Sequence, residues 1–252
     1  MIKIVETGNK FGTMNTSTMS KELTKEEKNA IFMEHRMAVG EEYGFDGRKM
    51  FMADQLDKVG TYFEITQDYV NANPNGWTDI REDILIVTDK VPGVVIGHPV
   101  ADCPVVIMHD VKKNVCAIAH CSADLIDKKM PMMIADALLH AYESCDEDII
   151  TYVSACAGTS WTYDSYPSFA KDIDVWKNCI EEEKGIFRIN LRKAVNRQLN
   201  ERNISNGNIK YNMDDTITNP HYYSNNAASP YGLNDQSKYG RNFAGAFYKV
   251  KK

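Results

Sequence analysis

The chain has 252 residues, of which 43% are apolar and 25% are charged, and its formal net charge is −6. This is enough apolar sequence to bury a core in one large domain. The negative charge provides no basic field for nucleic acid or for an anionic membrane, so neither is an expected partner. No apolar segment approaches the ~20 residues of a membrane span, and the amino-terminal residues lack the apolar stretch of a secretion signal, so we expect a cytoplasmic protein.

The first third of the chain predicts one helix and a pair of strands. Thr24 is followed three residues later by a glutamate, the spacing of a capping box, so a helix is expected to run from there to a stop at Gly44. Residues 51–65 are typical of two strands joined by a turn near Gly60. Residues 70–81, which include the sequence Asn-Pro-Asn-Gly, predict a loop.

From residue 83 the pattern changes to short apolar runs that end at prolines and glycines. Four strands are expected here, over residues 84–88, 94–97, 105–108 and 115–119. Further on we expect helices over residues 129–142, 169–183 and 191–201, strands over residues 149–157, 209–213 and 243–250, and a long loop over residues 222–239. Strands and helices mix without a strict βαβ rhythm, which favours a single α+β (mixed α/β) domain over residues 1–252.

The six cysteines are spread along the chain and include no Cys-x-x-Cys pair. In a chain with no secretion signal this distribution indicates reduced thiols rather than a disulfide framework. It also argues against a structural zinc site made of four cysteines.

The most distinctive motifs are Ala-Asp-Cys-Pro, which contains Cys103, and Ala-His-Cys, which contains His120. Two apolar runs and a polar turn separate them. If the turn centres on residues 111 and 112, Cys103 lies directly opposite His120 in an antiparallel pair. Opposed residues have Cβ atoms about 4.5–5.5 Å apart, so a thiolate and an imidazole could share one soft or borderline metal ion. A register shift of one residue would place them on opposite faces.

Each of these residues also has a purely structural interpretation. Free cysteines are often buried and inert, and His120 could be an ordinary core histidine. Asp102 could orient the imidazole through a hydrogen bond, or it could cap a backbone turn. His98, at the end of the preceding strand, could reach the same place. Three tyrosines near glycines could form a stacking wall for a planar ligand or be surface aromatics; they are Tyr222, Tyr223 and Tyr239.

Together the motifs resemble the laccase-domain family of bacterial multicopper polyphenol oxidase-like proteins, later regarded as zinc-containing enzymes of purine nucleoside metabolism. The resemblance covers nearly the whole chain and follows the family's order and spacing. It rests on His35-Arg36, Gln55-Leu56-Asp57-Lys58, Val87-Thr88-Asp89, Pro92-Gly93-Val94, Ala101-Asp102-Cys103-Pro104, Asp110, Ala119-His120, residues 191–199, Asp215-Thr216, Tyr223-Ser224 and Tyr239-Gly240-Arg241. It implies the family fold, a central mixed sheet flanked by helices.

The resemblance also implies a site and an activity. The family's metal-ligand positions fall on Asp57, Cys103 and His120, with zinc as the expected ion and copper as the alternative. It implies catalytic roles for Cys103 and His120. The implied reaction is phosphorolysis of adenosine or inosine, with adenosine deamination as a further activity. The residues that it implies for binding the small-molecule substrate are Gln55, Ser224 and Arg241.

The chain departs from the family at residues that bear on this activity. Asp57 stands where the family has a histidine; a carboxylate still binds zinc but suits Cu(I) less well. The family's arginines after His120 and after Ser224, which resemble a phosphate clamp, are replaced, and Arg241 is the matched arginine that is left. Two alternatives therefore stay open: a diverged member that binds a metal and a purine or phenolic ligand, and a copper-dependent phenol oxidase. Six scattered histidines without a His-x-His pair argue against a multicopper cluster.

Overall fold

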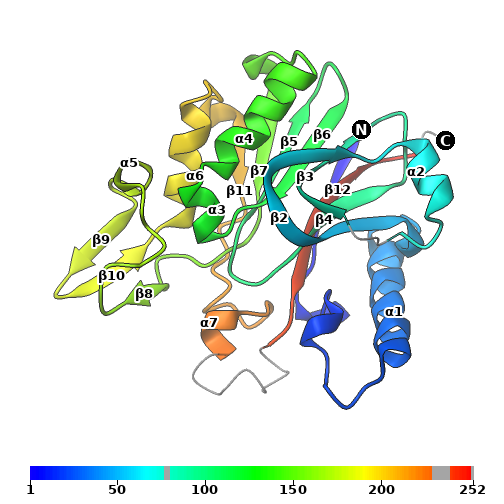
Figure 1. Cartoon of the computed structure of the whole chain (residues 1–252), viewed down its shortest axis with the longest axis horizontal. Helices are drawn as coiled ribbons and strands as arrows, with labels where there is room; N and C mark the ends of the chain where they lie inside the picture. Colours follow the sequence, from blue (N-terminus) through cyan, green and yellow to red (C-terminus); the bar gives the residue numbers. More distant parts are fainter. Residues whose placement is uncertain (77–79, 229–238, 251–252) are drawn as a thin grey trace.

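The computed structural model describes residues 1–76, 80–228 and 239–250, and it describes residues 54–58 by their backbone alone. Its main feature is a nine-stranded sheet with the order β1-β12-β4-β2-β3-β6-β5-β7-β11 (Figure 1). Strand β2 is parallel to β3 and β4, β11 is parallel to β7, and the other neighbours are antiparallel, so the expected mixed sheet is confirmed. The strands are β1 (Ile2–Glu6), β2 (Met50–Glu64), β3 (Ile80–Thr88), β4 (Val95–Val100), β5 (Val105–Asp110), β6 (Val115–His120), β7 (Ile149–Val153), β11 (Ile209–Tyr211) and β12 (Asn242–Tyr248).

The sheet curls at β2, which joins the strands β1, β12 and β4 on one side to the strands β3, β6, β5, β7 and β11 on the other. Residues 50–52 of β2 pair with β4, and residues further along the same strand pair with β3. The curl brings β4 against β5 and β6, and β12 against β5, although none of these strands are neighbours in the sheet. Apolar residues from both halves pack into one buried cluster, which includes Phe51, Leu85, Ile107, Ile118 and Ala246. This curl decides which side chains can meet at the site described below.

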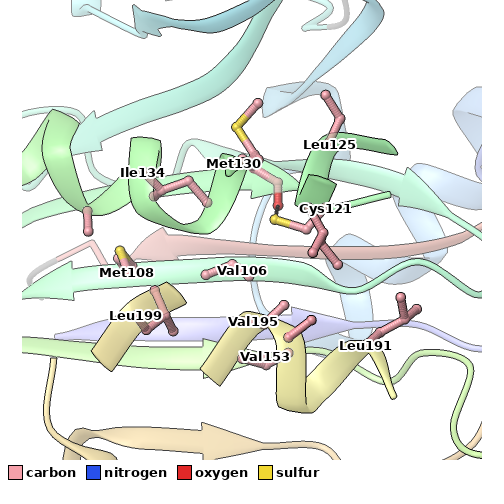
Figure 2. Packing of buried hydrophobic residues seen from close by; sticks show 14 of the residues in the cluster. Val106, Met108, Cys121, Leu125, Met130, Ile134, Val153, Leu191, Val195 and Leu199 are labelled. Carbon is pink, nitrogen blue, oxygen red and sulfur yellow. Dashed lines mark hydrogen bonds between the residues drawn. The ribbon is translucent and has the colours of Figure 1, made fainter. Parts of the chain in front are cut away.

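Helices cover the outer surfaces of the sheet. Helix α1 packs through Phe32 and Val39 onto β1, β2, β4 and β12. Helices α3, α4 and α6 cover β3, β5, β6 and β7, and Figure 2 shows Val195 and Leu199 close to Val106 in this layer. The helices are α1 (Lys25–Tyr43), α2 (Gln67–Ala72), α3 (Ala123–Asp127), α4 (Met130–Asp136), α5 (Ile173–Trp176), α6 (Leu191–Asn200) and α7 (Asn225–Ala228). None of the helices in the described part of the chain combines the length and the apolar character needed to cross a membrane.

The ends of α1 are those expected from the sequence. The Thr24 hydroxyl accepts a hydrogen bond from the Glu27 amide at 3.2 Å, and the Glu27 carboxylate accepts one from the Thr24 amide at 2.8 Å. Gly44 ends the helix with a φ of 82°, a left-handed conformation that glycine adopts without steric cost. The capping box and the glycine stop are therefore confirmed.

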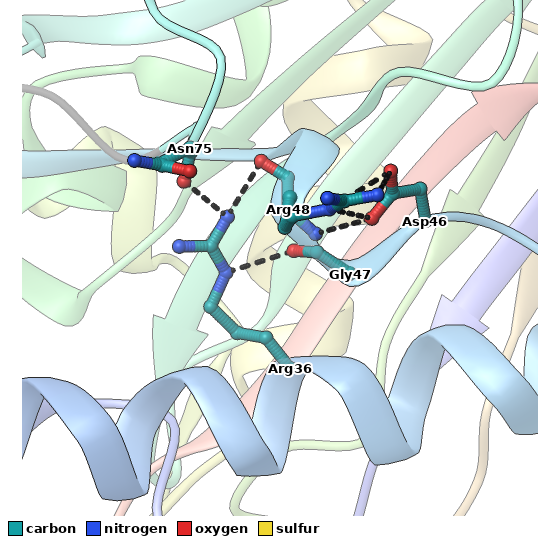
Figure 3. Close-up of polar contacts among 5 residues, drawn as sticks. All are labelled: Arg36, Asp46, Gly47, Arg48 and Asn75. Atoms are coloured by element: carbon teal, nitrogen blue, oxygen red, sulfur yellow. Dashed lines mark hydrogen bonds and ion pairs between the residues drawn. The ribbon is translucent and has the colours of Figure 1, made fainter.

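Arg36 connects α1 to the start of β2 (Figure 3). Its side chain is 2% exposed, and its guanidinium donates hydrogen bonds of 3.0 Å each to the carbonyls of Gly47, Arg48, Met50 and Asn75. Burial lowers the pKa of Arg36 to about 10. A planar group with five donors satisfies several carbonyls at once, so one side chain orders three backbone segments.

Three expectations about elements are wrong. Residues 51–65 form one strand rather than two, because Gly60, at a φ of 78°, lies at an irregularity in β2 instead of a reversing turn. Residues 70–81 are not all loop, since α2 extends to Ala72 and β3 begins at Ile80. Residues 169–183 hold only the short α5 and strand β9 (Ile180–Glu183) of a second sheet. Lys184 and Gly185 have φ angles of 55° and 80°, so they form a two-residue hairpin turn from β9 to β10 (Ile186–Ile189).

The second sheet has three strands in the order β8-β10-β9, with β8 at Thr162–Tyr163. Elsewhere the expectations hold more closely. The helix expected over residues 129–142 is α4 followed by a π-helical turn at Ala137–Ala141, and α6 and β12 lie where they were expected. The expected loop at residues 222–239 contains α7, and residues 229–238 lie outside the described residues.

Candidate metal centre

The hairpin of β5 and β6 has a different register from the expected one. Val105, not Cys103, lies opposite His120, and the turn contains four residues, 111–114, rather than two. The Asp110 carboxylate causes this, because it accepts hydrogen bonds from the amides of Lys112 and Lys113 at 2.8 Å each. Cys103 therefore precedes β5 and is not directly opposed to His120. The register differs by two residues, so the side chains keep the faces expected for them.

The two motifs still meet at the backbone. The Cys121 amide donates a hydrogen bond of 2.9 Å to the Pro104 carbonyl, which joins the residue after His120 to the residue after Cys103. The structure therefore brings the Cys103 and His120 segments together through this bond, although not through the opposed pair that the sequence predicted.

Asp102 holds three loops together at the start of β5. Its backbone has a φ of 75°, and its carbonyl accepts a hydrogen bond of 2.7 Å from the Ala157 amide. Its carboxylate accepts one bond of 2.7 Å from the Thr216 hydroxyl and two of 2.9 Å from the amide and side chain of Asn226. The described contacts therefore assign Asp102 to loop positioning, rather than to the hydrogen bond to an imidazole that was weighed from the sequence.

The Cys103 thiol is half-buried and free. Burial raises its pKa to about 12, the charge of Asp102 raises it further, and the charge of Arg241 acts in the opposite direction. The thiol is therefore protonated at neutral pH. A bound metal ion would displace this proton, because a metal-coordinated thiol is deprotonated.

His98 and His120 lie next to each other across the curl of the sheet. Their ring centroids are 6.3 Å apart, and the rings are inclined by 36°. The Nε2 atom of each ring is buried without a hydrogen-bond partner. Burial lowers the pKa of His98 to about 3 and that of His120 to about 4, so both rings are neutral at pH 7. Neutral imidazoles are the form that binds metal ions.

Among the predicted substrate-binding residues, Arg241 is the one whose charge acts on Cys103 and His120. Its charge lowers the pKa of both Cys103 and His120. Its guanidinium donates hydrogen bonds of 2.9 Å to the Asn225 side chain and to the Gly240 carbonyl, and it lies 5.6 Å from the centroid of the Tyr239 ring. One cation thus acts electrostatically on both a thiol and an imidazole.

The other predicted residues are placed differently. Ser224 is 1% exposed, and its hydroxyl accepts a hydrogen bond of 3.0 Å from the Ala227 amide, so it caps α7. Gln55 and Asp57 lie on β2, but their side chains are outside the described residues. Their predicted roles in substrate and metal binding stay predictions.

The donors suit a zinc ion in kind. Two imidazole nitrogens and one thiol are the ligand types of zinc sites, and unpartnered buried Nε2 atoms are what an absent ligand would leave. Within the ranges that the structure describes, however, no three histidine, cysteine, aspartate or glutamate side chains are close enough together to hold an ion. A complete site therefore needs a further ligand from residues 54–58 or a small approach of Cys103 towards the two rings.

Two cavities lie near these residues. One, of about 210 Å³, is lined by Thr13, His35, Tyr223 and Tyr239, so two of the three tyrosines considered as a stacking wall do share a cavity. Tyr222 does not line it, and its hydroxyl instead donates a hydrogen bond of 3.1 Å to Asp214.

The second cavity, of about 530 Å³, was not expected from the sequence. It opens beside the start of α6, and its lining includes Gly158, Asn190, Arg192, Lys193 and Asp215. Arg192 lines this cavity while donating hydrogen bonds to backbone carbonyls of residues 156, 212 and 214. The sequence signal was the helix predicted over residues 191–201, whose first turn supplies Arg192 and Lys193.

The family described as multi-copper polyphenol oxidoreductase laccase matches residues 7–248. The chain belongs to this family. Solved structures with the same fold include YfiH from Bacillus licheniformis, described as a hypothetical protein, with a TM-score of 0.72 and 18% identity over 96% of this chain and 88% of that one. YlmD from Geobacillus stearothermophilus has a TM-score of 0.71 and 14% identity over 99% and 91% of the two chains. Neisseria meningitidis protein NMB0706 has a TM-score of 0.67 and 13% identity over 99% and 95%.

This membership confirms the resemblance and the mixed α/β fold inferred from the motifs. At identities of 18% or less the solved structures show the fold alone. Among curated proteins, none matches this chain. The metal, the substrate and the reaction of this laccase-family chain must therefore be argued from its own residues.

Proposed function

We propose that this laccase-family chain is a zinc-dependent enzyme that acts on purine nucleosides in the cytoplasm. In its main reaction, phosphate cleaves adenosine or inosine to the free base and ribose 1-phosphate, and deamination of adenosine is a further activity. The supporting observation is the position of Arg241, whose charge acts on both Cys103 and His120 and whose guanidinium lies beside Tyr239. An anion-binding group thus acts on two metal-ligand types and lies beside a tyrosine that lines a cavity, which supports the proposal. All six cysteines are free, as in a reducing compartment.

The chain's own residues divide into three roles in this proposal. Asp57, Cys103 and His120 would hold the zinc, which supplies Lewis acidity to the reacting nucleoside. Arg241 would bind phosphate, because a guanidinium matches phosphate oxygens in geometry and charge. A phosphate oxygen attacks the anomeric carbon of the ribose, the bond from that carbon to the base breaks, and the base leaves after taking up a proton. Gln55 and Ser224 are the remaining proposed substrate-side residues, and Ser224 would act through its hold on α7.

One observation favours the alternative that the chain has lost phosphorolysis. The family's arginines after Ser224 are replaced by two asparagines, and both are already engaged inside the protein. The Asn225 side chain accepts a hydrogen bond from Arg241, and the Asn226 side chain donates one to Asp102. This chain would then bind a metal and a purine or phenolic ligand without transferring phosphate. Copper-dependent phenol oxidation is the third outcome to be tested.

The test is turnover of adenosine and of inosine by zinc-loaded protein, with and without phosphate, followed by chromatography of the products. We expect free base that appears only with phosphate, and loss of this activity in Cys103→Ala. Cys145→Ala is the matched control, because Cys145 is also free and is exposed outside the site. No free base and no deaminated product would refute the proposal. Phenol oxidation by the copper-loaded protein alone would assign the family's oxidase activity instead.

A further inference from the structure

We propose that His98 is a metal ligand of this chain and provides the second imidazole beside His120. The inference deepens the proposed function, since it concerns the same metal centre, but it concerns metal binding and not turnover. It goes beyond the three ligand positions that the family motifs indicate, because residue 98 is none of them. The observation behind it is the approach of two buried imidazole rings across the curled sheet, whose centroids are 6.3 Å apart and whose Nε2 atoms both lack a hydrogen-bond partner.

The fold orients His98 towards β6. His98 lies on β4, its side chain is 1% exposed, and it makes a hydrogen bond with the backbone of Ile118 on β6. This bond raises the pKa of His98, as expected when a ring N–H donates to a carbonyl. Because Nε2 has no partner, Nδ1 is the donating atom. Metal-binding histidines are usually oriented in this way, with one ring nitrogen donating to a carbonyl and the other left for the metal.

The position of His120 is consistent with a shared ion. His120 lies two residues after Ile118 on the same strand, so both side chains leave β6 on the same face. Two imidazoles that bind one zinc through Nε2, at about 2.0–2.1 Å each, have ring centroids on the order of 5–6 Å apart. The observed separation is 6.3 Å, so the two rings must come closer together to share one ion.

The energy of the buried nitrogens also points to a ligand. A buried polar atom without a hydrogen bond destabilises the fold, so two of them together are unfavourable unless something binds there. Cys103 lies on the segment that is bonded to β6 through the Pro104 carbonyl and the Cys121 amide, so its thiol is the nearest candidate donor in the sequence motifs. Imidazole nitrogens and thiolates are donor types that a borderline ion such as zinc accepts, so His98 would add a suitable ligand to the positions of the proposed function.

The test is the zinc affinity of the full chain, measured by competition with a chromophoric chelator. The variant is His98→Asn, because the asparagine amide can replace the Nδ1–H donor to Ile118 while it offers no Nε2 lone pair. The control is His109→Asn, which removes another histidine whose Nε2 is buried and unpartnered, on β5 and outside the site. Changing a residue that only orients a metal ligand costs up to about a hundredfold in affinity, and losing a ligand should cost at least as much. We therefore expect zinc binding to weaken by at least about a hundredfold in His98→Asn and to be unchanged in His109→Asn.

Nitrogen NMR of histidine-labelled wild-type protein gives a second measurement that does not depend on how the variant folds. We expect His98 to carry its proton on Nδ1 before zinc is added, and the Nε2 resonances of His98 and His120 to shift at one equivalent of zinc. Equal zinc affinity in His98→Asn and wild type, an unshifted His98 resonance, or a wild-type chain that binds no zinc would overturn the inference. Zinc binding that depends on His98 without nucleoside turnover would refute only the proposed function. Turnover with zinc retained in His98→Asn would refute only this inference.

Discussion

Replacing Arg36 tests whether one buried cation holds the start of β2 in place. Its guanidinium donates to four backbone carbonyls of three segments that meet at the end of α1. Arg36→Ala removes all four hydrogen bonds and leaves a cavity. Because residues 50–52 carry the pairing of β2 with β4, the change should weaken the fold well beyond the substituted residue.

The expected loss in the free energy of unfolding is about 3–5 kcal/mol, because the lost hydrogen bonds and the new cavity together outweigh the cost of burying the charge. The hydrogen bonds to Gly47 and Met50 are buried, and each carbonyl left without a donor costs about 1–3 kcal/mol. The cavity adds about 2–5 kcal/mol. One effect acts in the opposite direction. Burial lowers the pKa of Arg36 from 12.5 to about 10, which shows that keeping this charge buried is unfavourable. At about 1.4 kcal/mol per pKa unit, removing the charge restores about 3 kcal/mol of stability.

The assay is urea denaturation followed by circular dichroism at neutral pH. Arg36→Met fills most of the volume, so it should lose less stability than Arg36→Ala. Arg48→Ala is the control, because the Arg48 side chain is 59% exposed in its ion pair with Asp46, and exposed pairs contribute little. If Arg36→Ala unfolds within about 0.5 kcal/mol of the wild type, as ordinary surface changes do, the carbonyl network is not what stabilises this region.

Two further predictions concern Asp102 and His109. Asp102→Asn replaces one carboxylate oxygen, which accepts a hydrogen bond from Thr216 or Asn226, by an NH₂ group that cannot accept one. The free energy of unfolding in urea should fall by about 1.5–3 kcal/mol, the value of a hydrogen bond to a charged group. An unfolding midpoint equal to that of the exposed Asp164→Asn control would contradict the role given to Asp102. Burial lowers the pKa of His109 below its usual 6.5, so as the pH falls the unfolded chain binds this proton first and the free energy of unfolding decreases. His109→Asn should therefore lose less stability than the wild type between pH 7 and pH 5, and identical pH slopes would show that His109 is not the titrating group.

The strands around the site could be predicted because their signals are local. The runs that became β5 and β6 are apolar, four to six residues long and bounded by proline or polar turns. Their register was wrong by two residues because the side chain of Asp110 caps a four-residue turn, and nothing in the apolar pattern reports that. The same limit applies to β9 and β10: the helix expected over residues 169–183 took in β9, and no strand was expected after the two-residue turn at Lys184 and Gly185.

That His98 could reach His120 was expected only from its place at the end of the preceding strand, and the order of the strands explains why the contact itself could not be predicted. Their strands are separated by β2 and β3 in the sheet, so a reading of neighbouring strands places them apart. They meet only because β2 changes partner along its length and curls the sheet. Arg241 was found through its motif, but its effect on both Cys103 and His120 also depends on long-range packing.

The position of β12 has a consequence for how this chain is made. β12 pairs with β1 on one side and with β4 on the other, so one of the last described segments to be synthesised lies between two of the earlier ones. While a nascent chain is still on the ribosome, β1 has no strand to pair with and β4 has an open edge until residues 242–248 emerge. Open strand edges favour aggregation, and pairing over such long sequence separations is slow. Interrupted translation shortly before β12 would therefore release a chain that holds the other described strands of the sheet but leaves β1 and β4 unprotected, a natural substrate for chaperones and proteases.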